Sequence, residues 1–213
     1  GALVTVATSG TTMTVTLTGA EDLDVRCVAG VVTVNTKTGS PTVPCATFSK
    51  LTVNGDSSKQ TIDGRDLEVA AFAAKPYLVA ALGDGPDIVD TTSRADSIDM
   101  GPGDDRLYGG LGNDLVDGGE GYDEIRGRDG NDTLIGNDVG NRLAGGRGND
   151  SLDGGSGNDS LYGGDGNDTL KQNLGGPNEV MDGGAGIDTG DWSYNSFDPW
   201  TINLGAGTAK IGA

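Results

Sequence analysis

The sequence contains no histidine and only two cysteines, and aromatic residues make up 5% of it. Without histidine, the chain lacks the means to build a Ser-His-Asp or Cys-His catalytic arrangement or a histidine-ligated zinc site. No apolar run approaches the length of about 20 residues that spans a membrane. Basic residues number 14 against 32 acidic ones, and without a basic patch we expect no nucleic-acid partner.

Apolar residues are also scarce for a chain of this length. Only 34% of its 213 residues are hydrophobic, and 39 are glycine. This composition is typical of a disordered Gly/Asp/Asn linker, and it is too thin for a large globular core. A solenoid needs fewer apolar residues, because each coil buries only a narrow strip against its neighbours. The order of the residues therefore decides between linker and solenoid.

The chain is organised around a nine-residue repeat with the frame G-G-x-G-x-D-x-U-x, in which U is apolar. Ten units follow one another from Leu82 to Lys171, Gln172 and Asn173 then interrupt the frame, and two looser units extend it to Asp191. The ten units begin at Leu82, Thr91, Met100, Gly109, Gly118, Gly127, Gly136, Gly145, Gly154 and Gly163. So strict a period predicts a solenoid, with two units in each coil, and not a linker.

The eighth position of the unit is apolar in all ten copies: Val89, Ile98, Leu107, Val116, Ile125, Leu134, Leu143, Leu152, Leu161 and Leu170. One inward apolar residue between outward neighbours predicts a strand of three residues. Glycines at positions one, two and four, with asparagine at position five, predict a six-residue turn that uses left-handed backbone angles. Successive turns would then alternate between two edges of the solenoid.

The sixth position is aspartate in nine of the ten units. Turns two units apart stack on one edge, so we define the Asp123 edge, with Asp87, Asp105, Asp123 and Asp159, and the Asp114 edge, with Asp96, Asp114, Asp132, Asp150 and Asp168. Stacked coils lie roughly 4.8 Å apart, and carboxylates held so close repel one another unless a cation lies between them. Calcium suits such a gap, because it takes six to eight oxygen ligands, whereas magnesium demands a tighter octahedron.

We therefore predict about five to eight calcium ions between the turns, from the number of usable turn pairs. The predicted aspartate ligands are Asp87, Asp105, Asp114, Asp123, Asp132, Asp150, Asp159, Asp168 and Asp188. The predicted glycine ligands, through the turn backbone, are Gly103, Gly110, Gly112, Gly119, Gly121, Gly130, Gly146, Gly148, Gly155, Gly157, Gly164 and Gly166.

The repeats from Leu82 to Asp191 resemble the repeats-in-toxin (RTX) family of calcium-binding β-rolls, which occur in secreted bacterial toxins, proteases, lipases, epimerases and surface proteins. The resemblance covers about half of the chain. It implies an all-β fold, a right-handed parallel β-roll that folds when calcium binds, with the sixth-position aspartates of stacked turns as ligands. It does not say what the roll is attached to.

The acidic charge belongs to the repeats. Residues 82–191 carry 24 acidic and 7 basic residues, within a chain whose net charge is −18. Without calcium, such dense like charge and so little core predict disorder, and calcium binding would then drive folding. Extracellular calcium modules bind in the range of about 10⁻⁴–10⁻³ M, so cytosolic calcium would leave them empty. We therefore expect an extracellular location, either secreted or at the cell surface.

Residues 1–81 form a separate N-terminal region that is rich in alternating Thr and Val. Runs around Thr12–Thr18, Val32–Val34 and Leu51–Val53 predict strands of wider solenoid coils that lead into the repeats, with a small β-sandwich as the alternative. Cys27 and Cys45 predict one disulfide, worth about 3 kcal/mol, with two buried thiols as the alternative. Lys59 to Asp63 resembles a degenerate repeat with an extra residue, and the stretch from residue 66 to 82 is compatible with a short helix or a strand pair.

Residues 192–213 form the third region. Trp192 and Trp200 predict an aromatic cap over the last coil, with a sugar-stacking platform as the alternative. Thr201–Leu204 predicts a further strand, and the Gly/Ala-rich end is compatible with further repeats in a longer parent chain. We see no signal peptide and expect Gly1 to follow a processing boundary.

We expect a non-enzymatic calcium-binding β-roll with a structural or adhesive role, whose partners are calcium and a cell-surface glycan or a larger parent chain. One alternative is a calcium-assisted polysaccharide lyase that takes its base from Arg94, Arg126, Arg128, Arg142 or Arg147. Another is a surface that binds glycan or ice through the N-terminal threonine rows, although threonine is ordinary in strands.

One unit, Gly136 to Ala144, departs from the frame. It carries Val139 at position four and Asn141 at position six, while Leu143 keeps the apolar column. Asparagine offers a neutral oxygen, and valine resists left-handed angles. We therefore predict a continuous calcium line on the Asp114 edge and an interrupted one on the Asp123 edge.

Overall fold

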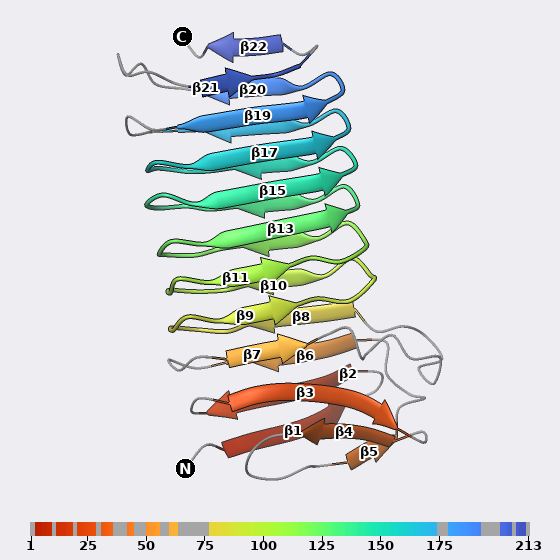
Figure 1. Cartoon of the computed structure of the whole chain (residues 1–213). Helices are drawn as coiled ribbons and strands as arrows, with labels where there is room; N and C mark the ends of the chain where they lie inside the picture. Colours follow the sequence, from red (N-terminus) through yellow and green to blue (C-terminus); the bar gives the residue numbers. More distant parts are fainter. Residues whose placement is uncertain are drawn as a thin grey trace.

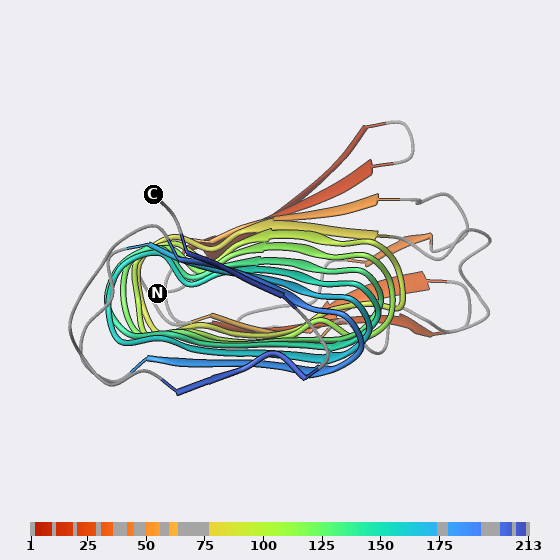
Figure 2. The ribbon, with the colours of Figure 1, turned by 90° about the horizontal axis from the view of Figure 1, so that it is seen from above.

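The computed structural model describes residues 3–9, 12–18, 21–28, 31–35, 42–44, 50–55, 60–63, 77–173, 179–192, 201–205 and 208–211. Within these ranges all helices and strands that are assigned are β-strands, with no helix among them. The strands form two sheets of eleven strands each. The sheets lie face to face, so that the molecule is a flattened coil seen from above (Figure 1; Figure 2). In the described part of the chain, no helix is long and apolar enough to cross a membrane.

Sheet A contains, in spatial order, β1 (Leu3–Ser9), β2 (Thr12–Thr18), β6 (Lys50–Asn54), β8 (Tyr77–Ala81), β10 (Ser97–Asp99), β12 (Leu115–Asp117), β14 (Thr133–Ile135), β16 (Ser151–Asp153), β18 (Thr169–Gln172), β20 (Thr189–Trp192) and β22 (Thr208–Ile211). Sheet B contains β21 (Thr201–Asn203), β19 (Val180–Ala185), β17 (Ser160–Asp165), β15 (Arg142–Arg147), β13 (Glu124–Asp129), β11 (Arg106–Tyr108), β9 (Ile88–Asp90), β7 (Gln60–Asp63), β3 (Glu21–Val28), β4 (Val31–Asn35) and β5 (Thr42–Pro44).

The repeat units alternate between the two sheets, so that two units make one coil. Strand β10 pairs in parallel with β12 and places Ile98 opposite Val116, while β11 pairs with β13 and places Leu107 opposite Ile125. The chain rises from its N- to its C-terminal end as a right-handed coil (Figure 1). The predicted all-β parallel β-roll is therefore confirmed.

The eighth-position column forms the core. Its ten residues, from Val89 to Leu170, are at most 3% exposed and belong to one apolar cluster. The same cluster continues to Val53 and Ile62 at one end and to Met181 at the other. In a three-residue strand the middle side chain points inward and its neighbours point outward, and burying each Val or Leu contributes about 1.5–3 kcal/mol. Each half-coil thus packs against its neighbours through the single apolar residue at the eighth position of its unit.

The turns differ in length between the edges, which the repeat frame did not predict. On the Asp123 edge, the predicted three-residue strand and six-residue turn hold, as between β12 and β13. On the Asp114 edge, β9 and β11 also keep three residues, but β13, β15, β17 and β19 run six residues, into the third position of the next unit. Pairing of Arg128 with Gly146 and of Asp129 with Arg147 extends the ladder there, so the turn shrinks to three residues.

Left-handed backbone angles occur at positions two and four, as in Gly110 (φ 90°) and Gly112 (φ 119°), but position-one glycines do not need them. The described non-glycine residues with positive φ are Arg128, Asn137 and Val139, which occupy positions two, two and four. Asparagine at position five is therefore not left-handed, and that prediction was wrong. Its side chain has a different role, described below.

The N-terminal strands continue both sheets. Strand β2 pairs in parallel with β6, and β3 with β7, while β1, β4 and β5 are added antiparallel. This confirms a solenoid-like cap. Of the stretch predicted as a short helix or a strand pair, Tyr77–Ala81 is a strand, while residues 66–76 lie outside the described residues. The strand predicted at Thr201–Leu204 is β21. Cys45 and residues 193–200 lie outside the described residues, so the disulfide and the aromatic cap stay predictions.

Candidate metal sites

The sixth-position side chains stack into a ladder on the Asp114 edge. Each is at most 3% exposed, and each main-chain N–H donates to the Oδ1 atom of the aspartate in the next coil. These bonds run from Asp96 to Asp114 (2.8 Å), from Asp114 to Asp132 (2.9 Å), from Asp132 to Asp150 (2.8 Å), from Asp150 to Asp168 (2.8 Å) and from Asp168 to Asp188 (2.9 Å). The backbone thus holds one oxygen of every carboxylate in place.

The Asp123 edge carries an equivalent ladder with two other residue types in it. Its bonds run from Asp87 to Asp105 (2.7 Å), from Asp105 to Asp123 (3.0 Å), from Asp123 to Asn141 (2.9 Å), from Asn141 to Asp159 (2.6 Å) and from Asp159 to Oε2 of Glu179 (3.1 Å). We did not predict Glu179, although it is the sixth residue of the looser unit that begins at Leu174 and could have been found there.

The second oxygen of these carboxylates has a different environment. It is buried and without a hydrogen-bond partner in the described structure for Asp105, Asp114, Asp123, Asp132, Asp150, Asp168 and Asp188. A buried carboxylate oxygen without a partner is costly, because it has lost its hydration. So regular a series of unsatisfied oxygens fits bound cations better than an accident of packing.

The turn glycines leave room for a cation beside these oxygens. At position one, a Cβ atom added to Gly109 would lie 2.7 Å from Oδ2 of Asp114. At position four, a Cβ atom on Gly112 would lie 2.5 Å from the carbonyl oxygen of Arg94 in the preceding coil. The glycines thus let a carboxylate of their own turn and main-chain carbonyls of the neighbouring coils come close to the turn backbone.

All twelve glycines predicted as ligands occupy positions two and four of their units, where Gly146 and Gly164 lie within the extended strands β15 and β17. Eleven of the twelve have positive φ, Gly103 being the exception. Within the described residues, no three acidic side chains converge on one point. A cation would therefore take most of its ligands from main-chain carbonyls. A set made only of oxygen atoms suits a hard cation such as calcium.

Burial shifts the acidity of the sixth-position carboxyls. It raises the pKa of Asp114 to about 8, of Asp123 and Asp150 to about 7, and of Asp159 to about 6. At Asp114, the charges of the neighbouring carboxylates in the ladder raise the pKa further. Without a cation, the folded ladder therefore favours protonated carboxyls near neutral pH.

Position-five asparagines form a second ladder on the Asp114 edge. The N–H of Asn131 donates to Oδ1 of Asn113 (2.8 Å), that of Asn149 to Asn131 (2.7 Å), and that of Asn167 to Asn149 (2.7 Å). The side-chain carbonyl of each asparagine thus accepts a hydrogen bond from the backbone of the next coil. On the Asp123 edge, Oδ1 of Asp104 accepts a bond of this kind from Tyr122 (3.0 Å).

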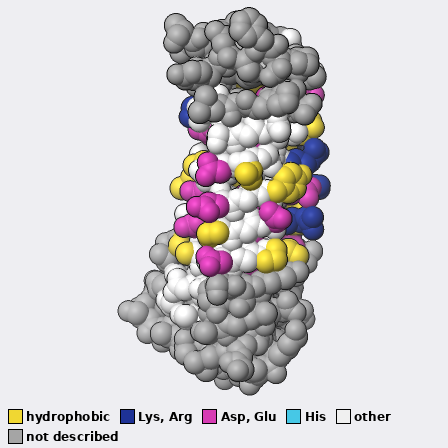
Figure 3. Space-filling view, turned by 90° about the vertical axis from the view of Figure 1, so that its left-hand side faces the viewer, with side chains coloured by type: hydrophobic (Ala, Val, Ile, Leu, Met, Phe, Trp, Pro, Cys, Tyr) yellow, Lys and Arg dark blue, Asp and Glu magenta, His cyan; other side chains and the backbone are white. Residues whose placement is uncertain are grey.

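The outer surfaces of the two sheets differ in charge. Viewed onto the Asp123 edge, Asp and Glu side chains gather mainly along the sheet A side and Lys and Arg mainly along the sheet B side (Figure 3). Arg126 pairs with Glu124 (2.5 Å) and lies 5.5 Å from the ring of Tyr108, and Arg142 lies 4.6 Å from the ring of Tyr162. These arginines, which we considered as lyase bases, are thus held against residues of their own sheet.

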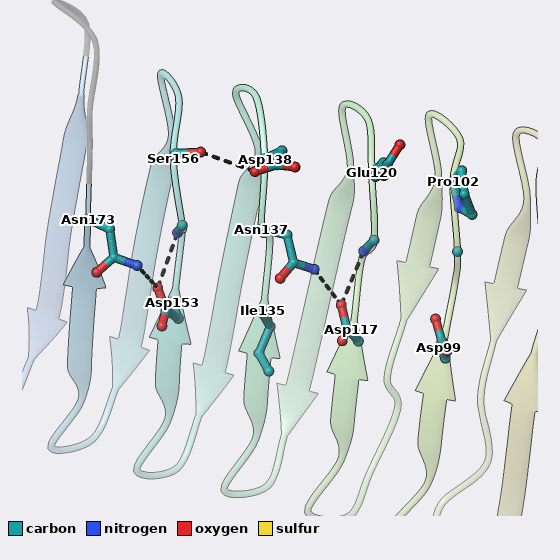
Figure 4. Close-up of a pocket in the computed structure, with 13 residues that line it drawn as sticks. Asp99, Pro102, Asp117, Glu120, Ile135, Asn137, Asp138, Asp153, Ser156 and Asn173 are labelled. Atoms are coloured by element: carbon teal, nitrogen blue, oxygen red, sulfur yellow. Dashed lines mark hydrogen bonds between the residues drawn. The ribbon is translucent and has the colours of Figure 1, made fainter.

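A groove of about 540 Å³ runs along the ends of the sheet A strands at the Asp123 edge (Figure 4). Asp99, Asp117 and Asp153 line it, and none of its lining residues is Lys or Arg. Asn137 donates to Oδ1 of Asp117 (2.5 Å) and Asn173 to Oδ1 of Asp153 (3.4 Å). The lining residues themselves thus offer no basic group for a lyase reaction, and the neighbouring Lys171 pairs through Nζ with Oδ2 of Asp153 (2.5 Å).

Comparison with known proteins agrees with this geometry. The family model of the RTX calcium-binding nonapeptide repeat matches residues 83–116, 111–139 and 135–170. A search of curated proteins found no match, and a search of solved structures found none either. The repeat frame, the parallel coils and the family match agree, and the segment from residue 83 to 170 belongs to the RTX calcium-binding nonapeptide repeat family.

Proposed function

We propose that this protein is a non-enzymatic calcium-binding β-roll module of a secreted or cell-surface protein, which folds when calcium binds and serves a structural or adhesive role. Proteins with RTX repeats are typically secreted, and their rolls typically bind calcium in a structural role, which supports this proposal. The partner beyond calcium would be a cell-surface glycan or a longer parent chain.

One observation carries the proposal: the ladder of buried carboxylates whose second oxygens lack partners. Without a cation these oxygens oppose folding, because each has lost its water and lies one coil away from the next charge. With calcium, each turn pair becomes a cross-link between successive coils. About five to eight ions would offset roughly 10 to 16 negative charges.

Calcium binding would therefore supply free energy of folding. The core contributes one buried apolar residue per nine, which is little for a segment that carries 24 acidic residues. Extracellular calcium near 10⁻³ M would load sites of the affinity usual for such modules, whereas the cytosol would not. The chain would thus remain unfolded before export and fold outside the cell.

The test is a calcium titration of the chelator-treated protein, followed by circular dichroism and by calorimetry. We expect little β structure beyond residue 82 in chelator, a cooperative gain on adding calcium, and about five to eight ions bound. Magnesium at the same concentration should give a much smaller gain. An unchanged spectrum and hydrodynamic radius in excess chelator would contradict the proposal.

Asp150→Asn provides a matched variant for this titration. Asn141 already shows that asparagine preserves the ladder, because its Oδ1 accepts the N–H of Asp123 (2.9 Å). The substitution should therefore keep the backbone and remove one charged ligand. We expect fewer bound ions and a higher calcium midpoint; if neither changes, Asp150 is not a ligand.

A further inference from the structure

Three turns of the roll supply an internal hydrogen-bond donor where the regular turns have an unsatisfied group. The donors are Gln172 and Asn141 on the Asp123 edge and Thr92 on the Asp114 edge. Gln172 stands where the frame would place a position-one glycine, and Thr92 replaces a position-two glycine. Asn141 replaces the position-six aspartate.

Gln172 lies 18 residues after Gly154, where a position-one glycine would stand, and its side chain is fully buried. Its Nε2 atom donates to Oδ2 of Asp159 at 2.5 Å. Oδ2 of Asp159 thus has a hydrogen-bond donor. In the preceding unit, Oδ2 of Asp150 is buried and has no hydrogen-bond partner in the described structure. The other amide atom, Oε1 of Gln172, is buried without a partner in the described structure.

Asn141 acts on the carbonyls of its own turn. Its Nδ2 atom donates to the carbonyl oxygens of Asp138 (3.0 Å) and Val139 (3.3 Å). Val139 stands at position four, whose carbonyl faces the gap between coils: a Cβ atom on Gly157 would collide with it. The amide thus occupies a carbonyl that a regular turn leaves for a cation.

Thr92 closes the first turn of the Asp114 edge in the same way. Its main-chain N–H and its hydroxyl donate to Oδ2 of Asp96 at 2.8 and 2.9 Å. The N–H of Leu78 donates to Oδ1 of the same carboxylate at 2.6 Å. Both oxygens of Asp96 therefore have protein partners before any metal binds.

We propose that these side chains stand in for calcium. Amides replace the ion over the C-terminal half of the Asp123 edge, and Thr92 replaces it at the start of the Asp114 edge. Calcium then occupies an unbroken line from Asp114 to Asp188 and, on the opposite edge, the turns of Asp105 and Asp123. This inference rests on the proposed calcium function and removes Asp159 from the expected ligands.

The physical basis is that a donated N–H satisfies a buried carboxylate or carbonyl oxygen without adding charge or needing an ion. The coils between Gly136 and Gln172 would thus be closed on the Asp123 edge by the protein alone and on the Asp114 edge by calcium. This stretch should keep more structure in chelator than the coils around Asp105 and Asp123.

The decisive experiment compares Asp159→Asn with Asp150→Asn, since the two residues lie in consecutive units on opposite edges. Calcium is counted by calorimetry and by metal analysis of the refolded, dialysed full chain. We expect Asp150→Asn to lose at least one ion and Asp159→Asn to lose none. Loss of an ion from Asp159→Asn would overturn the inference. Wild-type protein that binds no calcium would instead overturn the proposed function.

Gln172 provides the second arm. Gln172→Glu places a carboxylate beside Asp159, so we expect one additional ion. Gln172→Ala frees Oδ2 of Asp159, so the number of ions should not fall, while amide hydrogen exchange near Asp159 in chelator should speed up at least several-fold. If Gln172→Ala loses an ion, Gln172 is a calcium ligand through Oε1 and not a substitute for the ion.

Discussion

The two edges of the roll are built from one nine-residue frame, yet they differ in chemistry. On the Asp114 edge, aspartates from Asp114 to Asp188 have unsatisfied second oxygens, and an asparagine ladder runs beside them. On the Asp123 edge, this regularity stops after Asp123, where Asn141 and Gln172 supply their own donors. One buried apolar residue per unit is therefore enough to pack a coil, whereas a metal site requires suitable residues at several polar positions of the same turn.

Acid is expected to have the largest effect, because it acts on both edges. Burial raises the pKa of Asp114 to about 8 and of Asp150 to about 7, while an aspartate in the unfolded chain has a pKa of about 3.9. A raised pKa in the folded state means that the stabilisation is fully present below about pH 4 and is lost as the pH rises through about 7 to 8. In chelator, the β signal in circular dichroism should therefore grow as the pH falls from 8 to 5.

The same titration in saturating calcium is the control for this prediction. Calcium already neutralises the carboxylates, so the folded signal should stay nearly constant over the same range of pH. A chelated protein that is equally unfolded at pH 5 and pH 8 would show that buried carboxylates are not what opposes folding.

Glycine substitutions at position four separate the edges. Gly148 (φ 124°) on the Asp114 edge faces the Gly130 carbonyl, and Gly157 (φ 129°) on the Asp123 edge faces that of Val139. Alanine at either position should cost at least about 1–2 kcal/mol for the left-handed backbone alone. Gly148→Ala should also lose a calcium ion, whereas Gly157→Ala should not, as measured by thermal unfolding and metal analysis. Equal ion loss from both variants would contradict the difference between the edges.

An aspartate in the middle of the Asp114 edge should contribute more to calcium affinity than one near its end. Asp132 lies between Asp114 and Asp150 and should contribute to two sites, whereas Asp188 near the end should contribute to one at most. Losing charged ligands of this kind costs on the order of 1–3 kcal/mol. Asp132→Ala should thus raise the calcium midpoint roughly tenfold, and Asp188→Ala by less. Equal midpoints would argue against ions shared between stacked turns.

The smallest expected effect comes from repairing the irregular unit. Val139 holds φ at 51°, which a β-branched residue resists, and Val139→Gly should recover about 1 kcal/mol. Together with Asn141→Asp, it should free the turn carbonyls and add one or two ions, seen as a higher unfolding temperature in calcium. If the pair adds neither ions nor stability, calcium does not bind between these turns.

Much of the fold can be predicted from the sequence, because the nine-residue repeat indicates which residues are buried and which turns stack. The column from Val89 to Leu170 predicted the core, and the 18-residue spacing of the aspartates predicted which turns stack. The irregular unit was recognisable from Asn141 and Val139 alone. The errors concern features in which the same nine-residue frame folds differently on the two edges. Examples are the six-residue strand at Arg142–Arg147 and the side-chain role of the asparagines at position five.

The period, the buried column and the row of carboxylates can be read from the sequence, since each depends on residues that recur at fixed spacing. Which carboxylate oxygens are already satisfied depends on how the coils stack. Gln172 and Asp159 are 13 residues apart and belong to different turns, so no local pattern relates them. Their contact exists because stacking brings successive coils together, and a two-residue interruption of the frame places an amide where glycine would leave room.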